Sequence, residues 1–432
     1  MRAARYASMI CNKFDGCAQF IFFNGIIPKC HSHHDTMAQG GPAADMNRLG
    51  CMVFGLLIFL CIALPAGRGY AENAALSEDQ TLSEQKAPAS KGRWLPIPMF
   101  LTEPAFGYGF GLALGYFHPE KDTGPDESLA TLQIPKSVTS DRSAQKPPPD
   151  ITGVAAGYTE KDPWFSALGH SASWRHDTIR YAGAVAYAVV KSTYYIFDRP
   201  FDFELNGTAV YQDLKFRLGS SQFFIGGKLV YLETESAFDI TINEETEIPA
   251  GNISSRNVGV ATELSFDRRD NTFTPNRGQL ANLALWRHDA AIGSDYDYWH
   301  LTFKALSFHQ LASDFVLGLR LEGSAVDGRV PFYAYPWVKL RGIPAMRYQG
   351  KSVGMMEVEG RWNILPRWAL LGFVGTGAVG GKDPAFETRD YIVAGGVGGR
   401  YLLMPDQGLW LGVDLARGPE QRYVYVTVGH AW

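Results

Sequence analysis

"FVLGLRLEGS", residues 315–324, alternates between two kinds of side chain at almost every step. The apolar set is Phe315, Leu317, Leu319 and Leu321, and the opposing small or charged set is Gly318, Arg320, Glu322 and Ser324. A period of two places alternate side chains on opposite faces of a β-strand, whereas a helix would show a period of 3.6. Residues 179–189 and 257–267 show the same alternation. These segments are therefore predicted to be strands, each with one apolar face.

About sixteen such segments follow one another from Trp94 to the C-terminus. They start near residues 94, 107, 151, 164, 178, 204, 221, 253, 278, 297, 314, 353, 367, 389, 407 and 420. Turn-forming residues separate them, as in DRPFD, DRRDNTFTPNRG and ARGPEQ. An even number of roughly ten-residue strands with alternating faces is typical of a transmembrane barrel. We predict an all-β fold, a transmembrane antiparallel β-barrel of about sixteen strands over residues 94–432.

A secreted β-sandwich would show the same alternation, with its apolar faces turned inward. Two features favour the barrel. The polar faces carry small and charged residues, as a wet lumen requires, and the chain ends on an aromatic residue in RYVYVTVGHAW, residues 422–432.

The composition excludes several classes of protein. A net charge of -4 and an isoelectric point near 6.2 argue against binding to nucleic acid. A mean hydropathy of -0.12 is too polar for a bundle of membrane helices. The 46 glycines and the 13% of aromatic residues suit curved strands with aromatic belts at the membrane surfaces.

The N-terminal part indicates export. Residues 46–71 are predicted to be a signal peptide: Arg48 supplies the positive charge, MVFGLLIFLCIAL the apolar core, and Ala71 ends a small-residue cleavage site. Residues 1–45 are then a non-native N-terminal extension. All five cysteines lie upstream of Ala71, which leaves the mature chain without thiols or disulfides. The cluster CHSHH falls within the extension, and we predict no metal site.

Two further segments read as disordered. Residues 72–93 are polar, small and proline-bearing, and are predicted to be a linker. Residues 119–150 are proline-rich, charged and without period, and are predicted to be an insertion on the periplasmic side.

One loop breaks the pattern of simple connections. YPWVKLRGIPAMRYQG, residues 335–350, holds Arg341 and Gly342 between prolines and aromatic residues. In the strand that follows, Glu357 and Glu359 share the polar face, so they would point into the lumen. Folded inward, the loop would bring the planar guanidinium to these carboxylates. The alternative, an extracellular loop with an arginine in solvent, remains open from residue types alone.

These segments resemble the BamA/TamA superfamily of outer-membrane barrels, also known as bacterial surface antigens. FDRRDNTFTPNRG (266–278) is similar to the family's Asp-x-Arg-Asp…Pro-x-x-Gly segment, and MEVEGRW (356–362) to its Glu-x-Arg strand. The C-terminal Gly429 and Trp432 resemble the closing-strand signal by which such barrels are recognised. The resemblance implies sixteen strands, with a sixth extracellular loop whose tip folds into the lumen.

The loop tip both matches and departs from that family. Leu340, Arg341 and Gly342 match the tip, whereas Ile343 replaces the usual aromatic residue. A later strand usually carries Phe-x-Asp-x-Gly, whose aspartate also holds the arginine, but here Gly375 stands at that position. We therefore expect Glu357 and Glu359 to carry the salt bridge. Only about twenty linker residues are expected between Ala71 and the first strand, which is too short for the family's POTRA modules, so the chain resembles a short barrel-only member.

Three functions are compared. The first is outer-membrane biogenesis, by insertion or translocation of protein or lipid. Its expected partners are outer-membrane lipids and unfolded barrel proteins or periplasmic partners. The second is a structural or antigenic barrel, or a passive pore, without an assembly role. The third, an enzyme, lacks any GxSxG or HExxH motif, so we predict no catalytic residue and no cofactor. We expect a monomer in the outer membrane of a Gram-negative bacterium.

The signal peptide makes a prediction about processing. The mature chain should begin at or near Glu72 and contain no cysteine, because cleavage follows Ala71. Mass spectrometry of the envelope protein should detect no peptide from residues 1–45. Recovery of such peptides from the membrane would contradict both the start site and the signal peptide.

Overall fold

The computed structural model describes residues 92–101, 109–119, 147–160, 162–196, 199–243, 246–249, 253–381, 391–430 and 432. The predicted extension, signal peptide and nearly all of the linker lie outside the described residues, as does most of the 119–150 segment.

Seventeen strands form in the described residues. The first nine are β1 (Arg93–Leu101), β2 (Gly109–Phe117), β3 (Ile151–Thr159), β4 (Trp164–Trp174), β5 (Ile179–Ile196), β6 (Arg199–Arg217), β7 (Phe223–Asn243), β8 (Thr246–Pro249) and β9 (Ile253–Asp267). The other eight are β10 (Gly278–His288), β11 (Asp297–Gln310), β12 (Phe315–Arg329), β13 (Ser352–Leu365), β14 (Trp368–Gly380), β15 (Ile392–Met404), β16 (Leu409–Arg417) and β17 (Arg422–Val428).

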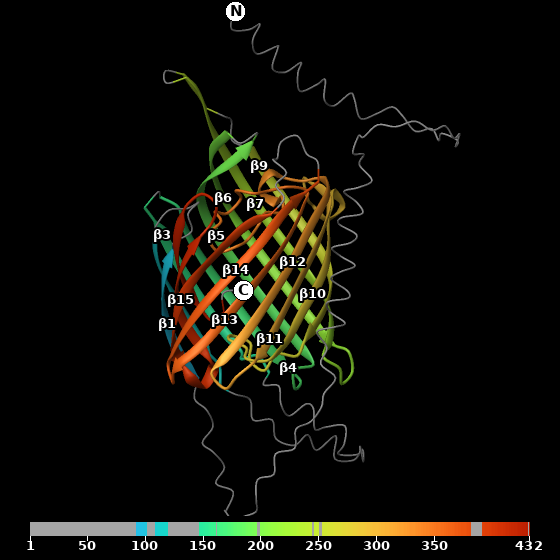
Figure 1. Cartoon of the computed structure of the whole chain (residues 1–432). Coiled ribbons are helices and arrows are strands. Elements are labelled where there is room, and N and C mark those ends of the chain that lie inside the picture. Colours follow the sequence, from blue (N-terminus) through green and yellow to red (C-terminus); the bar gives the residue numbers. More distant parts are fainter. Residues whose placement is uncertain are drawn as a thin grey trace, which may run out of the picture. The chain divides into compact units, whose positions relative to one another are not determined.

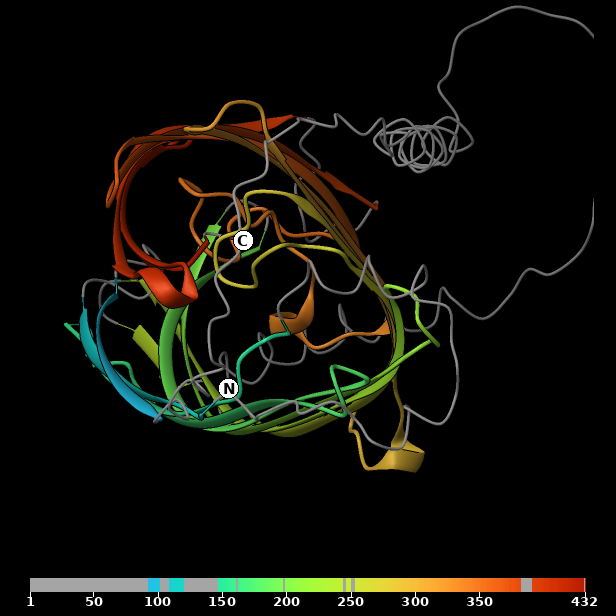
Figure 2. The same cartoon turned by 90° about the horizontal axis from the view of Figure 1, so that it is seen from below.

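Each strand pairs with its neighbour in the sequence, and every pairing is antiparallel. The four-residue β8 pairs only with the far end of β7, which itself pairs with β9. The other sixteen strands form the ring seen along its axis in Figure 2 and from the side in Figure 1. The prediction of an all-β antiparallel barrel with about sixteen strands is confirmed.

Successive connections alternate between the two ends of the barrel. We call the end with the β12–β13 connection the loop end, and the opposite end, with the β4–β5 and β9–β10 connections, the turn end. β5, β6 and β7 are 18, 19 and 21 residues long, and they extend beyond the other strands at the loop end (Figure 1).

The two faces of each strand differ sharply. Along β14, Leu371 and Phe373 are buried while Leu370 and Val374 are exposed. Exposed leucine, valine and tryptophan side chains recur around the outside, whereas the buried face carries many charged residues. A sandwich would bury its apolar face instead, so this distribution fits a barrel with a lipid-facing exterior.

The first and last strands do not complete the ring with a ladder. β1 and β17 lie next to each other, yet no register joins them in the described part of the chain. We call this junction between β1 and β17 the seam. A strand edge without a ladder leaves backbone groups free to pair with another strand.

Two prolines account for the weak seam. β1 pairs with β2 along its whole length, including Pro96 and Pro98. Proline has no N–H, so the donors that bind β2 must belong to the alternate residues such as Leu95 and Ile97. Positions 96 and 98 therefore direct their backbone toward β17, where the edge of β1 lacks two donors.

None of the described residues belongs to a helix that is long and apolar enough to cross a membrane.

If the exposed face contacts lipid, the cost of an arginine on it should depend on depth in the membrane. Val374, 55% exposed in the middle of β14, should not tolerate arginine, which costs roughly 2–4 kcal/mol at the bilayer midplane. Leu365, 58% exposed at the turn end of β13, is the matched control, because the cost falls to roughly 0–1 kcal/mol near the interface. Urea unfolding in lipid vesicles measures both. Equal destabilisation by Val374→Arg and Leu365→Arg would contradict a lipid-facing exterior.

Candidate functional site

The β12–β13 connection, residues 330–351, is folded rather than extended. It contains a short 3-10 helix, η4 (Phe332–Ala334), and an isolated bridge between Trp337 and Gln349. Leu340 and Ile343 are 4% and 3% exposed, and the Ile343 N–H donates to the Leu340 carbonyl at 3.0 Å. The predicted tip residues therefore form a buried tight turn.

Gly342 is required at the tip for two reasons. Its φ of +101° lies in the left-handed region, which favours glycine. A Cβ at this position would also lie 2.9 Å from the carbonyl carbon of Arg417 and from the backbone nitrogen of Gly418. The Gly342 N–H donates to the Tyr425 hydroxyl at 3.0 Å. The tip thus lies against the β16–β17 hairpin, whose β17 forms one side of the seam.

Arg341 contacts three carboxylates. Its Nη2 donates to Glu359 at 2.6 Å and also to Glu357, whose Oε1 lies 3.1 Å from Nε. Its Nη1 donates to Asp414 at 2.8 Å. The guanidinium also lies over the Phe373 ring, 3.5 Å from its centroid. A planar fork satisfies several carboxylates at once, which the point charge of a lysine does not do.

The surroundings keep Arg341 charged. Burial lowers the pKa of its guanidinium, but the negative charges of Glu359, Glu357 and Asp414 outweigh burial and raise the pKa above its ordinary value. The three carboxylates are at most 4% exposed. Charges so far from water are stable only while each has its partner.

Asp414 is the partner that the sequence analysis missed. It is fully buried on β16 and also binds both Nη atoms of Arg400, with Nη2 at 2.9 Å. The expectation that Glu357 and Glu359 alone would hold Arg341 is thus incomplete. The alternation of β16 offers a signal, because Asp414 is the one acid among the residues of LWLGVDLAR.

The structure also shows why Gly375 cannot carry the aspartate of the resembling family. A Cβ there would lie 2.8 Å from a methyl group of Leu340 and 2.9 Å from the Met356 carbonyl oxygen. The close approach of the loop tip to β14 fills the space that a side chain would need. Asp414 supplies the third carboxylate from a different strand.

The C-terminal residues lie beside this site, because His430 Nε2 is 3.5 Å from a carboxylate oxygen of Glu359. β17 ends at Val428, so Trp432 lies beyond the last strand. Gly429, with a φ of +81°, turns the chain, and the Trp432 ring lies 3.0 Å from an ideal Cβ on Gly318. Gly318 pairs with Glu359 and shares its inner face. A role of Gly429 and Trp432 as an insertion signal stays a prediction.

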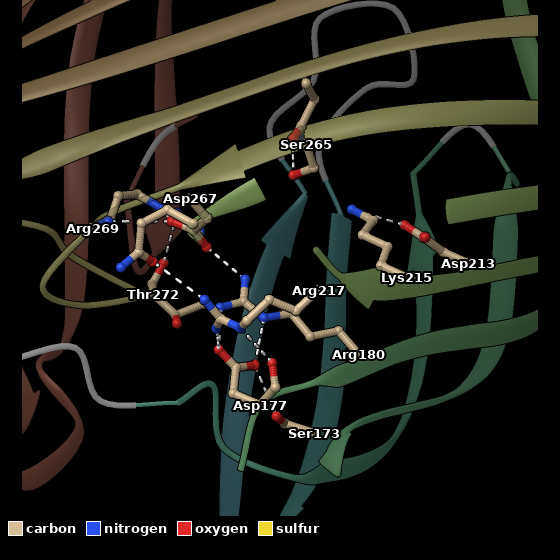
Figure 3. Close-up of polar contacts among 12 residues, drawn as sticks. Ser173, Asp177, Arg180, Asp213, Lys215, Arg217, Ser265, Asp267, Arg269 and Thr272 are labelled. Atoms are coloured by element: carbon tan, nitrogen blue, oxygen red, sulfur yellow. Dashed lines mark hydrogen bonds and ion pairs between the residues drawn. The ribbon is translucent and has the colours of Figure 1, made fainter. Parts of the chain in front are cut away.

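A second charged network lies at the turn end (Figure 3). Asp177 accepts two hydrogen bonds from Arg180, at 2.6 and 2.7 Å, and also pairs with Arg217. Arg180 continues to Asp267 at 2.7 Å, and Arg269 binds the same carboxylate at 2.9 Å. The aspartate and arginine of the DRRDNTFTPNRG segment therefore join the β9–β10 turn to β5 and to the β4–β5 turn.

The β9–β10 turn, residues 268–277, also reaches the opposite side of the barrel. The Asn271 amide donates to the Gln407 carbonyl at 3.0 Å, between β15 and β16. The Phe273 carbonyl accepts from the His430 N–H at 2.8 Å, just beyond β17. This turn therefore connects β9 and β10, which are central in the strand order, to the residues that follow β17 at the seam.

No group of three or more histidine, cysteine, aspartate or glutamate residues is arranged to hold a metal ion in the part of the chain that the structure describes.

Comparison with known proteins shows which solved structures share this fold. No protein-family model matches the chain, and no curated protein matches it. The fold is similar to that of BamA from Haemophilus ducreyi lacking POTRA domains 1-3, with a TM-score of 0.50 and 12% identity over 78% of this chain and 70% of that one.

CdiB from Acinetobacter baumannii gives a TM-score of 0.52, with 12% identity over 78% of this chain and 60% of that one. CdiB from Escherichia coli gives 0.54, with 11% identity over 79% and 63%. The chain thus spans less than two thirds of either CdiB. Identities this low establish a shared fold, and the resemblance to BamA-type barrels is confirmed at that level.

The contacts of Arg341 predict the effect of its loss. Arg341→Ala should lower the free energy of unfolding by about 3–5 kcal/mol, because it leaves buried carboxylates without their partner. Arg341→Lys should restore only part of this, since an ammonium cannot bridge three carboxylates. Urea unfolding of the folded barrel and protease digestion of the loop give the measurements.

Arg256 on β9 provides the control. Its guanidinium lies 3.9 Å from Glu233, the two side chains are 50% and 58% exposed, and such pairs contribute roughly 0–1 kcal/mol. Arg256→Ala should therefore leave stability and digestion almost unchanged. A similar small effect of Arg341→Ala would show that the three-carboxylate site does not hold the loop.

Proposed function

We propose that this chain is an outer-membrane barrel of a Gram-negative bacterium that acts in outer-membrane biogenesis, inserting or translocating protein or lipid. The fold shared with BamA and CdiB supports this proposal. The observation that carries it is the seam, which lacks a ladder and has two prolines on the edge of β1.

The mechanism is physical rather than chemical. An incoming strand of an unfolded barrel protein would pair with the free backbone groups at the seam, as in other cases of strand addition. Pro96 and Pro98 weaken the competing pairing of β1 with β17, because each removes a donor. Opening of the seam then costs few hydrogen bonds, and lipid lies directly beside it.

The loop tip would hold β17 in place while the seam opens. In this proposal the tip is held inside the lumen, and Arg341 ties it to β13 and β16. Gly342 adds a hydrogen bond to Tyr425 of β17. One side of the seam is thus anchored by the loop, while β1 lacks a comparable anchor among the described contacts.

The alternative is a structural or antigenic barrel, or a passive pore, without clients. The two proposals differ in whether other outer-membrane barrels need this protein for their assembly. Depletion of the protein in its native bacterium should reduce the amount of other outer-membrane barrels in the envelope proteome. An unchanged set of barrels would refute the assembly role and favour the alternative.

A variant of the seam tests the mechanism separately. Pro96→Val with Pro98→Val restores two donors on an apolar face, so the purified barrel should resist urea more strongly. In depleted cells this double variant should support less barrel assembly than the native chain. A matched Leu112→Val and Leu114→Val variant, on β2 opposite the prolines, should assemble normally. Full complementation by the more stable proline variant would contradict seam opening.

A further inference from the structure

A cavity of about 430 Å³ lies between the inner faces of β7 and β9–β13 and the β12–β13 loop. Its floor is formed by short side chains, among them Ala284, Thr302 and Ser324, which leave room beneath the loop. The opposite wall carries Tyr333 and Trp337 of the loop. This volume suits a small organic molecule, since ligand pockets range from roughly 300 to 1,000 Å³.

The charges around the cavity almost cancel. One connected chain of ion pairs runs along the inner wall, and its cations are Arg320, Lys304, Arg341 and Arg400, while its carboxylates are Glu322, Glu357, Glu359 and Asp414. A second group consists of Lys215 and Lys228 with Asp213 and Glu263, of which Figure 3 shows one pair. Four cations face four carboxylates, and two face two. Both groups are therefore neutral.

Lys339 is the cation left over. It lines the cavity, and no carboxylate of the described residues lies within 4 Å of its ammonium group, which sits 5.2 Å from the centroid of the Trp337 ring. Its backbone is fixed by a hydrogen bond from Arg320 to its carbonyl, at 3.0 Å. The cavity thus holds one surplus positive charge beside an aromatic ring.

The pKa of Lys339 is lowered, first by removal from bulk water and also by the positive charges of Arg320 and Lys304, although Glu322 raises it. An anion in the cavity would offset this repulsion. Amphipathic aromatic side chains next to a single cation can hold a flat ring and its acidic group together.

We infer that the cavity binds a small monovalent organic anion, in which a carboxylate contacts Lys339 and a flat apolar body packs against Tyr333 and Trp337. The ammonium of Lys304, paired with Glu322 at 3.3 Å, lines the same cavity and adds a second donor. The site does not depend on whether the barrel assembles other proteins.

Three probes of one shape test the charge preference. Phenylacetate, phenylacetamide and phenethylamine are titrated against the folded barrel in nanodiscs, with empty nanodiscs as the blank. Phenylacetate should bind saturably and at least about tenfold more tightly than the neutral amide, because a charge-assisted hydrogen bond is lost in the amide. The amine should not bind.

Lys339→Met keeps the apolar stem and breaks no ion pair, so the barrel should fold and lose at least about tenfold in affinity for phenylacetate. Lys191→Met is the control, since Lys191 pairs with Asp162 and Glu204 far from the cavity lining. The inference fails if no probe binds saturably, if the amide binds as well as phenylacetate, or if Lys339→Met binds like the native chain.

Discussion

The guanidinium of Arg341 is surrounded by three carboxylates that would repel one another without it. Glu357 and Glu359 are two residues apart on β13, and Asp414 comes from β16, so the repulsion acts within one strand and between two strands that β14 and β15 separate. The guanidinium of Arg341 offsets this repulsion by binding all three carboxylates. Arg320 adds positive charge beside Glu357, and Arg400 does so beside Asp414. The conformation of the loop 330–351, the barrel wall that it contacts and the cavity beside it all depend on this arrangement.

The ring of strands closes where β1 and β17 meet, and this is the one junction without a ladder among the described strands. The contacts that hold β17 run to the loop tip and to the β9–β10 turn. The Gly342 N–H binds the hydroxyl of Tyr425, in the middle of β17. At the turn end, the Phe273 carbonyl binds the His430 N–H, and the Phe273 ring lies 6.2 Å from that of Phe117 at the end of β2. No ladder joins the edges of β1 and β17 in the described residues.

Strand positions and faces followed from the sequence because a period of two is a local property that needs no knowledge of partners. The segment 353–362 is an example, since Glu357 and Glu359 were predicted to point inward and are buried. Asp414 was not predicted, because its contact with Arg341 depends on where the folded loop tip lies relative to β16, which a local pattern does not show. The contacts of His430 with Phe273 and of Trp432 with Gly318 were not predicted either, because they join residues that are far apart in the sequence.

Two departures from the resembling family are linked: glycine stands at position 375, and Asp414 supplies a carboxylate to Arg341. Gly375 leaves no side chain on β14, and the Leu340 methyl group occupies that space. The tip can therefore approach the wall closely, which brings Arg341 over the Phe373 ring and within reach of Asp414. An aspartate at position 375 would push Leu340 away and duplicate a charge already supplied by β16. The loss of one carboxylate and the use of another are thus two consequences of the same close packing between loop tip and barrel wall.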